Sequence, residues 1–176
     1  MNVDELVDVV DEHGRVLSRA RRAEVRRLNL RHRSAYVLVF NSERKLFIHR
    51  RTLTKDIYPG YWDVAIGGVL LSGEDYGAAA VRELSEELGL VVAALEPLFP
   101  FRFEDDQNRV LGHVYRCHSD GPFVLQTSEI LEGHWMEMED VAVRLAEESF
   151  CPDGAEVFRL FLSQQAAPRT SLTSRP

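Results

Sequence analysis

Short apolar runs alternate with polar turns through the first third of the chain. The stretch "LVDVVDEHGRVLSRA" holds two β-rich runs on either side of Glu12, His13 and Gly14, which predicts a hairpin, and a short helix is expected over residues 23–28. The nearly continuous apolar run "AYVLVF" is typical of a buried strand. The polar turn "NSER" separates it from "KLFIHRR", so the two runs predict paired strands.

The remaining chain mixes strand and helix patterns. Pro59 and Gly60 predict a loop over "TLTKDIYPGYW", after which "DVAIGGVLL" is expected to form a strand. Further strands are expected over "LEPLFPFRFED", "RVLGHVYRCHS", "FVLQ" and "EGHWMEM", and helices over residues 139–148 and 153–165. Residues 167–176 have no apolar anchors and predict a flexible tail.

The stretch "SGEDYGAAAVRELSEELGL" predicts the best-specified helix. Ser72 and Asp75 form a start that resembles a capping box, residues 78–88 favour helix, and Gly89 is a natural left-handed stop. At about 100° per residue, one apolar stripe is expected to be buried. It consists of Ala80, Val81, Leu84 and Leu88.

Three carboxylates share the neighbouring face of this helix: Glu83, Glu86 and Glu87. Like-charged pairs at this spacing cost ~0.2–0.5 kcal/mol each on an exposed helix, so the arrangement makes sense if a cation sits among them. Hard oxygen ligands favour Mg²⁺, with Mn²⁺ as the alternative. The simpler interpretation is a surface helix with solvated glutamates. Gly67 and Gly68 favour a site instead, because they end a strand where a backbone carbonyl can approach a metal ion.

Composition limits the architecture and the compartment. A length of 176 residues with 45% hydrophobic residues fits one domain, assigned to residues 1–166, with the hairpin and helix of about residues 6–30 packed on it. Cys117 and Cys151 are too few for a disulfide framework. The amino terminus is acidic where a secretory signal would be basic, and no apolar run approaches the ~20 residues of a membrane span. A cytoplasmic protein without a membrane segment is expected.

Charge limits the partners. The formal net charge of -7 argues against broad nucleic-acid binding, although residues 15–33 form a local arginine-rich block. This block is either a solvated helix face with a few salt bridges or a surface that faces a phosphate or a partner. The sequence leaves open whether two copies of the chain form a homodimer.

The spacing of the residues between Gly68 and Leu90 resembles a complete Nudix box. Its fixed positions are Gly68, Glu74, Arg82-Glu83-Leu84, Glu86-Glu87 and Gly89-Leu90. The resemblance extends from about Val7 to Leu162 and implies an α/β fold, a Nudix-type α/β/α sandwich around a mixed β-sheet. It also implies hydrolysis of a small-molecule diphosphate, namely a nucleoside diphosphate linked to some other moiety, by water that attacks phosphorus with help from a divalent metal.

The resemblance also implies roles for the box residues. The metal ligands would be Glu83, Glu86 and Glu87, with the Gly68 carbonyl as a fourth. Glu86 and Glu87 would be catalytic together with Arg82, which orients the glutamates through ion pairs.

Two further roles follow from the same resemblance. Glu74 would anchor the loop by pairing with Arg82. Family members use either a box glutamate or a distant one as the general base, so Glu86 is the choice here, with Glu104 and Glu129 as alternatives.

Basic and aromatic residues before the box are candidates for substrate contacts. Arg50, Arg51 and Lys55 stand at a strand end and in the following loop, where they could bind phosphate or merely be surface charges. Tyr58 and Trp62 could stack on a base, but a tryptophan beside a strand start is more typical of a core.

A narrower resemblance brings in a different reaction. The run from Arg31 to Gly68, with "RR", Lys55 and "PGYW", is similar to the isopentenyl-diphosphate isomerase branch of the superfamily. In an alignment with those enzymes, Gly67 and Val69 occupy the places of their catalytic cysteine and metal-binding histidine, and residues 108–110 hold no carboxylate. The chain therefore resembles the isomerase-like Nudix hydrolases. The alternatives are an isomerase acting on a prenyl diphosphate and a non-catalytic nucleotide-binding module.

Overall fold

The computed structural model describes residues 5–92 and 94–166, so the predicted tail over 167–176 lies outside the described residues. The chain starts with the antiparallel pair β1 (Leu6–Val10) and β2 (Val16–Arg21), followed by α1 (Arg22–Arg27). This is the predicted hairpin and short helix. A small apolar core joins these elements to Val69 in the main sheet, through Val7, Val9, Ala20 and Val25.

Within the described residues, seven strands form one mixed sheet. They are β3 (His32–Phe40), β4 (Leu46–Arg51), β5 (Trp62–Asp63), β6 (Ile66–Val69), β7 (Glu96–Glu104), β8 (Arg109–His118) and β9 (Ile130–Met136). The path β5-β4-β3-β8-β7 runs across the sheet, while β6 pairs with β3 and β9 pairs with β4. The β3–β8 pair is parallel and the others are antiparallel.

Strands β3 and β4 part from each other soon after the turn that joins them. Among the described residues they share only the register pair Phe40–Leu46. Beyond it, β3 pairs with β6, whereas β4 pairs with β9 and β5. The start of β3 and the end of β4 therefore lie on separate branches of the sheet, and side chains from both branches line the cavities described below.

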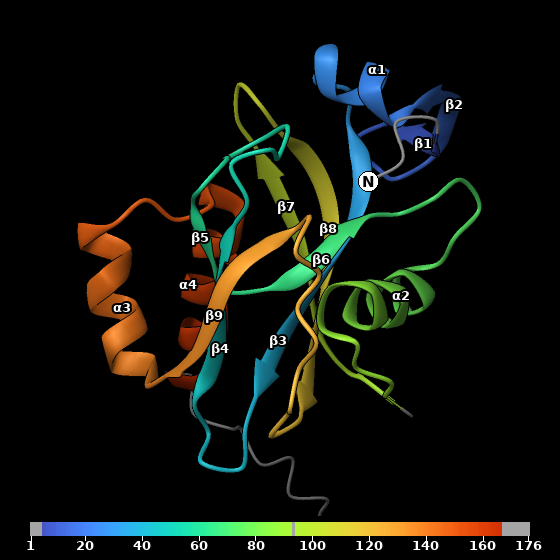
Figure 1. The fold of residues 1–176 in the computed structure, drawn as a ribbon. Helices are drawn as coiled ribbons and strands as arrows, with labels where there is room; N and C mark the ends of the chain where they lie inside the picture. Colours follow the sequence, from blue (N-terminus) through green and yellow to red (C-terminus); the bar gives the residue numbers. More distant parts are fainter. Residues whose placement is uncertain (1–4, 93, 167–176) are drawn as a thin grey trace, which may run out of the picture.

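Helices cover both faces of the sheet (Figure 1). On one face, α2 (Tyr76–Leu88) packs through Ala80, Leu84 and Leu88 against apolar residues of β3, β4 and β6. On the other face, α3 (Met138–Glu147) and α4 (Pro152–Ala166) bury Val141, Phe158 and neighbouring apolar residues. The predicted α/β/α sandwich around a mixed sheet is confirmed. No helix within the described ranges is both long and apolar enough to cross a membrane.

Two strand predictions are wrong. The expected strand "FVLQ" is irregular, because the backbone N–H groups of Val124 and Gln126 donate to carbonyls at the end of α2 instead of a neighbouring strand. The expected strand "DVAIGGVLL" is divided into β5 and β6. The cause is Asp63, whose Oδ1 accepts from the amides of Val64 and Ala65 and turns the backbone there.

Two details of α2 also differ from the prediction. Asp75, not Ser72, is the N-cap: its side chain accepts from Ala78 N at 2.9 Å, while the Ser72 hydroxyl donates to Asp8. Val81 is exposed and Ala79 is buried, so the buried apolar stripe of α2 consists of Ala79, Ala80, Leu84 and Leu88. The predicted stop is confirmed, because Gly89 adopts φ 63° in the left-handed region.

Candidate functional site

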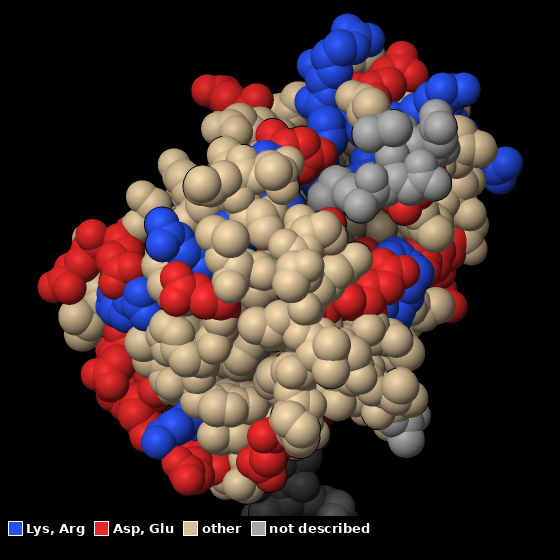
Figure 2. All heavy atoms as spheres, viewed as in Figure 1, with Lys and Arg blue, Asp and Glu red and all other residues tan. Residues whose placement is uncertain are grey.

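A polar cavity of about 140 Å³ lies where β6 meets α2. We call it the glutamate pocket, and its lining is Glu5, Arg22, Lys55, Gly67, Gly68, Arg82, Glu83, Glu86, Glu87, Gln126 and Glu129. The structure thus brings the proposed metal ligands together with Arg82 and Lys55, from separate elements. Figure 2 shows acidic and basic side chains side by side over α2.

The glycine pair of β6 lets two segments approach more closely than side chains would allow. A Cβ atom on Gly67 would fall well inside contact distance of the Ala35 carbonyl on β3. A Cβ atom on Gly68 would overlap the carboxylate at the end of the Glu83 side chain, which would have to move. Glycine is therefore required at position 67, and the missing side chain of Gly68 makes room for the Glu83 carboxylate in its observed position.

Arg82 ties the loop before α2 to the glutamates. Its Nε and Nη2 donate to the two carboxylate oxygens of Glu74 at 2.9 and 3.0 Å, and Nη1 donates to Glu83 Oε1 at 2.7 Å. A further bond from Nη2 reaches the Val69 carbonyl at 3.2 Å. Glu74 also accepts from Leu71 N at 2.8 Å. The structure contains the pairing of Glu74 with Arg82 that the family resemblance implies.

The three box glutamates differ in exposure. Glu87 is 5% exposed and Glu83 is similarly buried, whereas the Glu86 side chain is 51% exposed. Burial, followed by the negative charge of Glu83, raises the pKa of Glu87 to about 8. Burial also raises the pKa of Glu83. Two adjacent carboxylates are thus held in a place where their negative charge is unfavourable.

A divalent cation fits this donor set. Carboxylate oxygens are the hard ligands that Mg²⁺ and Mn²⁺ prefer, and a bound cation would offset the buried negative charge. Within the described residues, no group of three His, Cys, Asp or Glu side chains is arranged so that it could hold a metal ion. Mg²⁺ commonly binds one or two carboxylates and completes its shell with water and substrate phosphates, so a closed cage is not required.

The predicted phosphate-binding residues separate into two groups. Arg51 and Lys55 line a second cavity of about 50 Å³. Arg50 lines neither this cavity nor the glutamate pocket, because neighbouring strand residues point to opposite faces. Its side chain donates to the Gly60 carbonyl and lies 3.6 Å from Glu132.

We call this second cavity the arginine pocket. It is lined by Arg22, Arg26, Ser34, Tyr36, Arg51, Lys55, Ile57, Tyr58, Asp63, Ala65, Gly67, Gly68, Asn108, Cys151 and Asp153. It shares Arg22, Lys55, Gly67 and Gly68 with the glutamate pocket, so the two cavities adjoin. Sequence reasoning missed Arg22 and Arg26. The arginine-rich block was the signal, but nothing in it distinguished these two residues from their neighbours.

The candidates for the general base also separate. Glu86 and Glu129 line the glutamate pocket, and Glu129 forms an ion pair with Lys55. Glu104 lies elsewhere, in an exposed cluster with Arg31, Arg102 and Arg109.

Both aromatic candidates are buried. Trp62 belongs to the main core, as expected for a tryptophan beside a strand start, and the guanidinium of Arg144 lies 4.4 Å from the centre of its ring. Tyr58 lines the arginine pocket and its hydroxyl donates to Asp105 at 2.7 Å. Burial raises the pKa of Tyr58, so its hydroxyl stays protonated near neutral pH.

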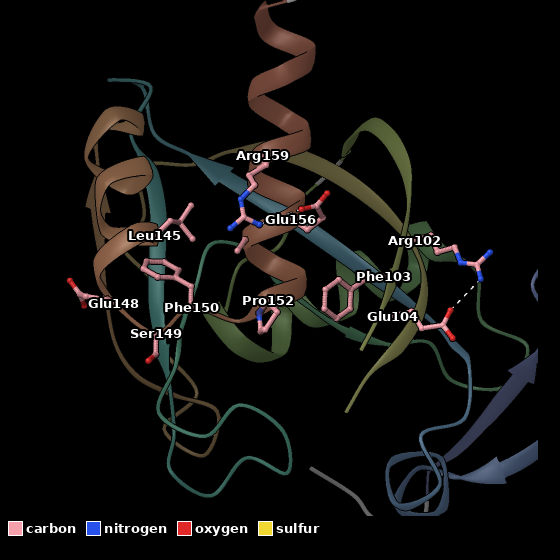
Figure 3. Close-up of a pocket in the computed structure, with 11 residues that line it drawn as sticks. Arg102, Phe103, Glu104, Leu145, Glu148, Ser149, Phe150, Pro152, Glu156 and Arg159 are labelled. Carbon is pink, nitrogen blue, oxygen red and sulfur yellow. Dashed lines mark hydrogen bonds and ion pairs between the residues drawn. The ribbon is translucent and has the colours of Figure 1, made fainter. Parts of the chain in front are cut away.

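A larger cavity, of about 580 Å³, lies between β7 and helices α3 and α4 (Figure 3). Its lining includes Phe103, Phe150 and Pro152, and Glu104 turns toward Arg102 at its edge. None of the box residues line it. Size alone therefore does not identify the candidate site, since the buried carboxylates and the basic side chains lie around Gly67 and Gly68 instead.

Comparisons with known proteins identify the family of the chain. A family model described as NUDIX domain matches residues 30–161. The uncharacterized Nudix hydrolase PA4841 of Pseudomonas aeruginosa is 41% identical over 158 residues, covering 90% of this chain and 94% of that protein. The uncharacterized Nudix hydrolase YfcD of Escherichia coli is 38% identical over 162 residues, covering 92% and 89%. The crystal structure of DR0079 from Deinococcus radiodurans has a TM-score of 0.79 at 31% identity, and the match covers 89% of this chain and 98% of that one.

Proposed function

Because the chain belongs to the Nudix family, we propose that it is a divalent-metal-dependent hydrolase that cleaves a diphosphate linkage. The substrate would be a nucleoside diphosphate derivative or a related organic pyrophosphate. The observation that carries this proposal is the glutamate pocket, in which Glu83 and Glu87 are buried side by side next to Lys55. This arrangement is unfavourable on its own and becomes favourable when a cation and a phosphate fill the pocket.

Each part of the pocket has a task in this reaction. Glu83 and Glu87 would hold Mg²⁺ or Mn²⁺ beside Gly68, and Arg82 keeps Glu83 in place. The bound cation would neutralise charge on the diphosphate and help to ionise water. Lys55 lies between the two cavities, where its ammonium would bind a phosphate oxygen.

Glu86 is the better candidate for the general base. A base must reach the attacking water, and the half-exposed side chain of Glu86 stands in the glutamate pocket where water can enter. Glu129 is buried and its carboxylate is occupied by the ammonium of Lys55, whereas Glu86, among the described residues, makes only a long contact, at 3.4 Å, with Arg82. Water would lose a proton to Glu86 and attack phosphorus, and the bond from phosphorus to the bridging oxygen would break, leaving two phosphate-containing products.

The isomerase alternative finds no support at these positions. Gly67 and Val69 have no side chain able to protonate an alkene or to bind a metal ion. Asn108 carries an amide that donates to Asp153, where the resemblance would require a carboxylate ligand.

Separation and quantification of the phosphate-containing products test the proposal. Nucleoside diphosphates and triphosphates, dinucleoside polyphosphates, nucleotide sugars, coenzyme A and prenyl diphosphates would each be assayed with Mg²⁺, Mn²⁺ or EDTA. We expect turnover of at least one class that requires the cation. Glu87→Gln should lower kcat by roughly 100-fold, equivalent to roughly 3 kcal/mol of barrier. Glu132→Gln is the matched control, because Glu132 is an exposed glutamate outside the pocket. Hydrolysis that survives EDTA and Glu87→Gln unchanged would contradict the proposal.

A further inference from the structure

The arginine pocket gathers four basic side chains around one small cavity. Among the described residues, its lining has four basic side chains, Arg22, Arg26, Arg51 and Lys55, and two carboxylates, Asp63 and Asp153. The three arginine side chains are 14%, 13% and 14% exposed. Each has a carboxylate nearby, but the ion pairs of Arg26 with Asp56 at 3.7 Å and of Arg51 with Asp63 at 4.0 Å are longer than hydrogen bonds. Guanidinium groups are normally buried with hydrogen-bonded counter-charges, so these two arginines need an explanation.

Each of the three arginines also has an unused donor. The Nε atoms of Arg22, Arg26 and Arg51 are buried and have no hydrogen-bond acceptor in the part of the chain that the structure describes. Other donors of the same side chains are engaged: Arg26 Nη1 donates to Asn108 Oδ1 at 2.8 Å, and Arg51 Nη2 donates to the Ile57 carbonyl at 3.1 Å. These guanidinium groups are therefore held in place, while the Nε–H group of each still lacks an acceptor.

The carboxylates of the pocket are already occupied with other donors. Asp153 accepts from the Tyr36 hydroxyl at 2.9 Å and from the Asn108 amide at 3.1 Å. Asp63 accepts from two backbone amides and lies 4.0 Å from Arg51. The nearest acidic group to Arg26 Nε is Asp56, at 3.7 Å, which is beyond hydrogen-bond distance. An anion with several acceptor oxygens would satisfy what these groups leave unpaired.

The size of the cavity limits which anion can enter. Its volume of about 50 Å³ is several times the ~10–15 Å³ that one water needs, but far below the ~300–1,000 Å³ of pockets that take drug-sized ligands. A phosphate group with free oxygens matches this size, whereas a phosphate that continues into a sugar or nucleoside does not. Because the arginine pocket adjoins the glutamate pocket through Lys55, Gly67 and Gly68, neighbouring phosphates of one substrate could occupy both.

We propose that the arginine pocket binds the terminal, unesterified phosphate of the substrate. This inference rests on the proposed diphosphate hydrolysis and narrows its substrate class. The enzyme acts on organic diphosphates or triphosphates that end in a free phosphate, and it discriminates against diphosphates that carry an organic group at both ends. Through Arg22 and Arg26, the arginine-rich block before β3 takes part in binding the substrate.

Pyrophosphate binding tests the pocket without any turnover. Titration calorimetry would be run in EDTA on the wild-type protein, Arg22→Gln, Arg26→Gln and the control Arg27→Gln, which removes an exposed arginine from the same helix. We expect the Kd for pyrophosphate to rise at least tenfold in the first two variants and less than twofold in the control. The far-ultraviolet circular dichroism spectrum checks that each variant is folded, and Arg22 and Arg26 provide two independent tests. Equal affinity in all four proteins would overturn the inference.

Paired substrates test the selectivity. In Mg²⁺, kcat/KM would be measured for ADP against ADP-ribose and for UDP against UDP-glucose, so that only the end of the diphosphate differs within a pair. We expect at least a tenfold preference for the free phosphate, and Arg26→Gln should reduce it. Hydrolysis of the doubly esterified member at the same rate would overturn the inference and leave the hydrolase function standing. If arginine-dependent pyrophosphate binding is found without hydrolysis of any diphosphate, the proposed function fails while the anion pocket stands.

Discussion

Burial of Glu87 predicts a pH-dependent loss of stability that one substitution should abolish. The pKa of this carboxyl lies at about 8 in the folded protein, against a reference of 4.5, because of burial first and the charge of Glu83 second. The folded state therefore binds more protons than the unfolded chain between pH 4.5 and about 8. The free energy of unfolding falls as the pH rises through this window. At ~1.4 kcal/mol per pKa unit, the ceiling for this effect is about 5 kcal/mol.

Urea denaturation in EDTA at pH 5.5 and pH 9 measures the loss. We expect the wild-type protein to lose at least ~2 kcal/mol more than Glu87→Gln over this range, because glutamine carries no charge to ionise. Glu86→Gln is the matched control: Glu86 is half exposed, so its substitution should keep the wild-type profile. Adding Mg²⁺ at pH 9 should return part of the lost stability to the wild-type protein, since the cation binds the folded state.

Two outcomes would refute this reasoning. If Glu87→Gln and the wild-type protein lose the same free energy between the two pH values, Glu87 is not the group that resists ionisation. If Glu86→Gln abolishes the loss instead, the buried and exposed positions of the two glutamates have been assigned wrongly.

Five further substitutions give sharp expectations. Gly68→Ala should lower kcat by roughly 100-fold, because its Cβ would displace the Glu83 carboxylate and a misplacement of ~1 Å is enough for such a loss. Gly73→Ala is the control, because a Cβ there meets open space and kcat should stay unchanged. The φ of +82° at Gly73 should nevertheless cost ~1 kcal/mol of stability. Asp75→Ala should cost ~1 kcal/mol in thermal denaturation by removing the N-cap of α2, and an unchanged melting temperature would contradict the assignment of the cap. Leu84→Ala should cost ~2–5 kcal/mol in urea denaturation, because the side chain is fully buried between α2 and the sheet, whereas Val81→Ala, at an exposed position of the same helix, should cost much less.

The parts of the site that lie close together in the sequence were predictable from it. Glycine, glutamate and arginine spacing around α2 predicted the helix, its stop and the grouping of the three glutamates. Local rules apply here because residues three and four apart on a helix share a face. The burial of Glu83 was beyond such rules, since it depends on the approach of β6 to α2 at Gly68.

The arginine pocket could be predicted only in part, through Arg51 and Lys55, because its other basic residues lie far from them in the chain. Arg26 and Asn108 are 82 residues apart yet share a hydrogen bond at 2.8 Å. In the sequence, Arg22 and Arg26 look the same as the exposed Arg21 and Arg27, and only the packing of the hairpin and α1 beside β6 selects between them.

The wrong strand predictions have a related cause. "FVLQ" has the apolar composition of a strand, but two of its amides satisfy carbonyls at the end of α2, which helix termini leave unpaired. In "DVAIGGVLL", the side chain of Asp63 competes with a sheet partner for the following amides. Both wrong predictions arise from hydrogen bonds of backbone amides, which the pattern of hydrophobic residues does not reveal.

Binding of a divalent cation in the glutamate pocket is tested most directly by titrating ¹⁵N-labelled protein with Mn²⁺ and following paramagnetic broadening of assigned amide signals. The amides of Gly68, Glu83 and Glu87 should broaden first, and Glu87→Gln should require a higher Mn²⁺ concentration for the same effect. Broadening that begins beside Glu148 and Glu156, in the cavity between β7 and helices α3 and α4, and that is unchanged in Glu87→Gln would contradict the account.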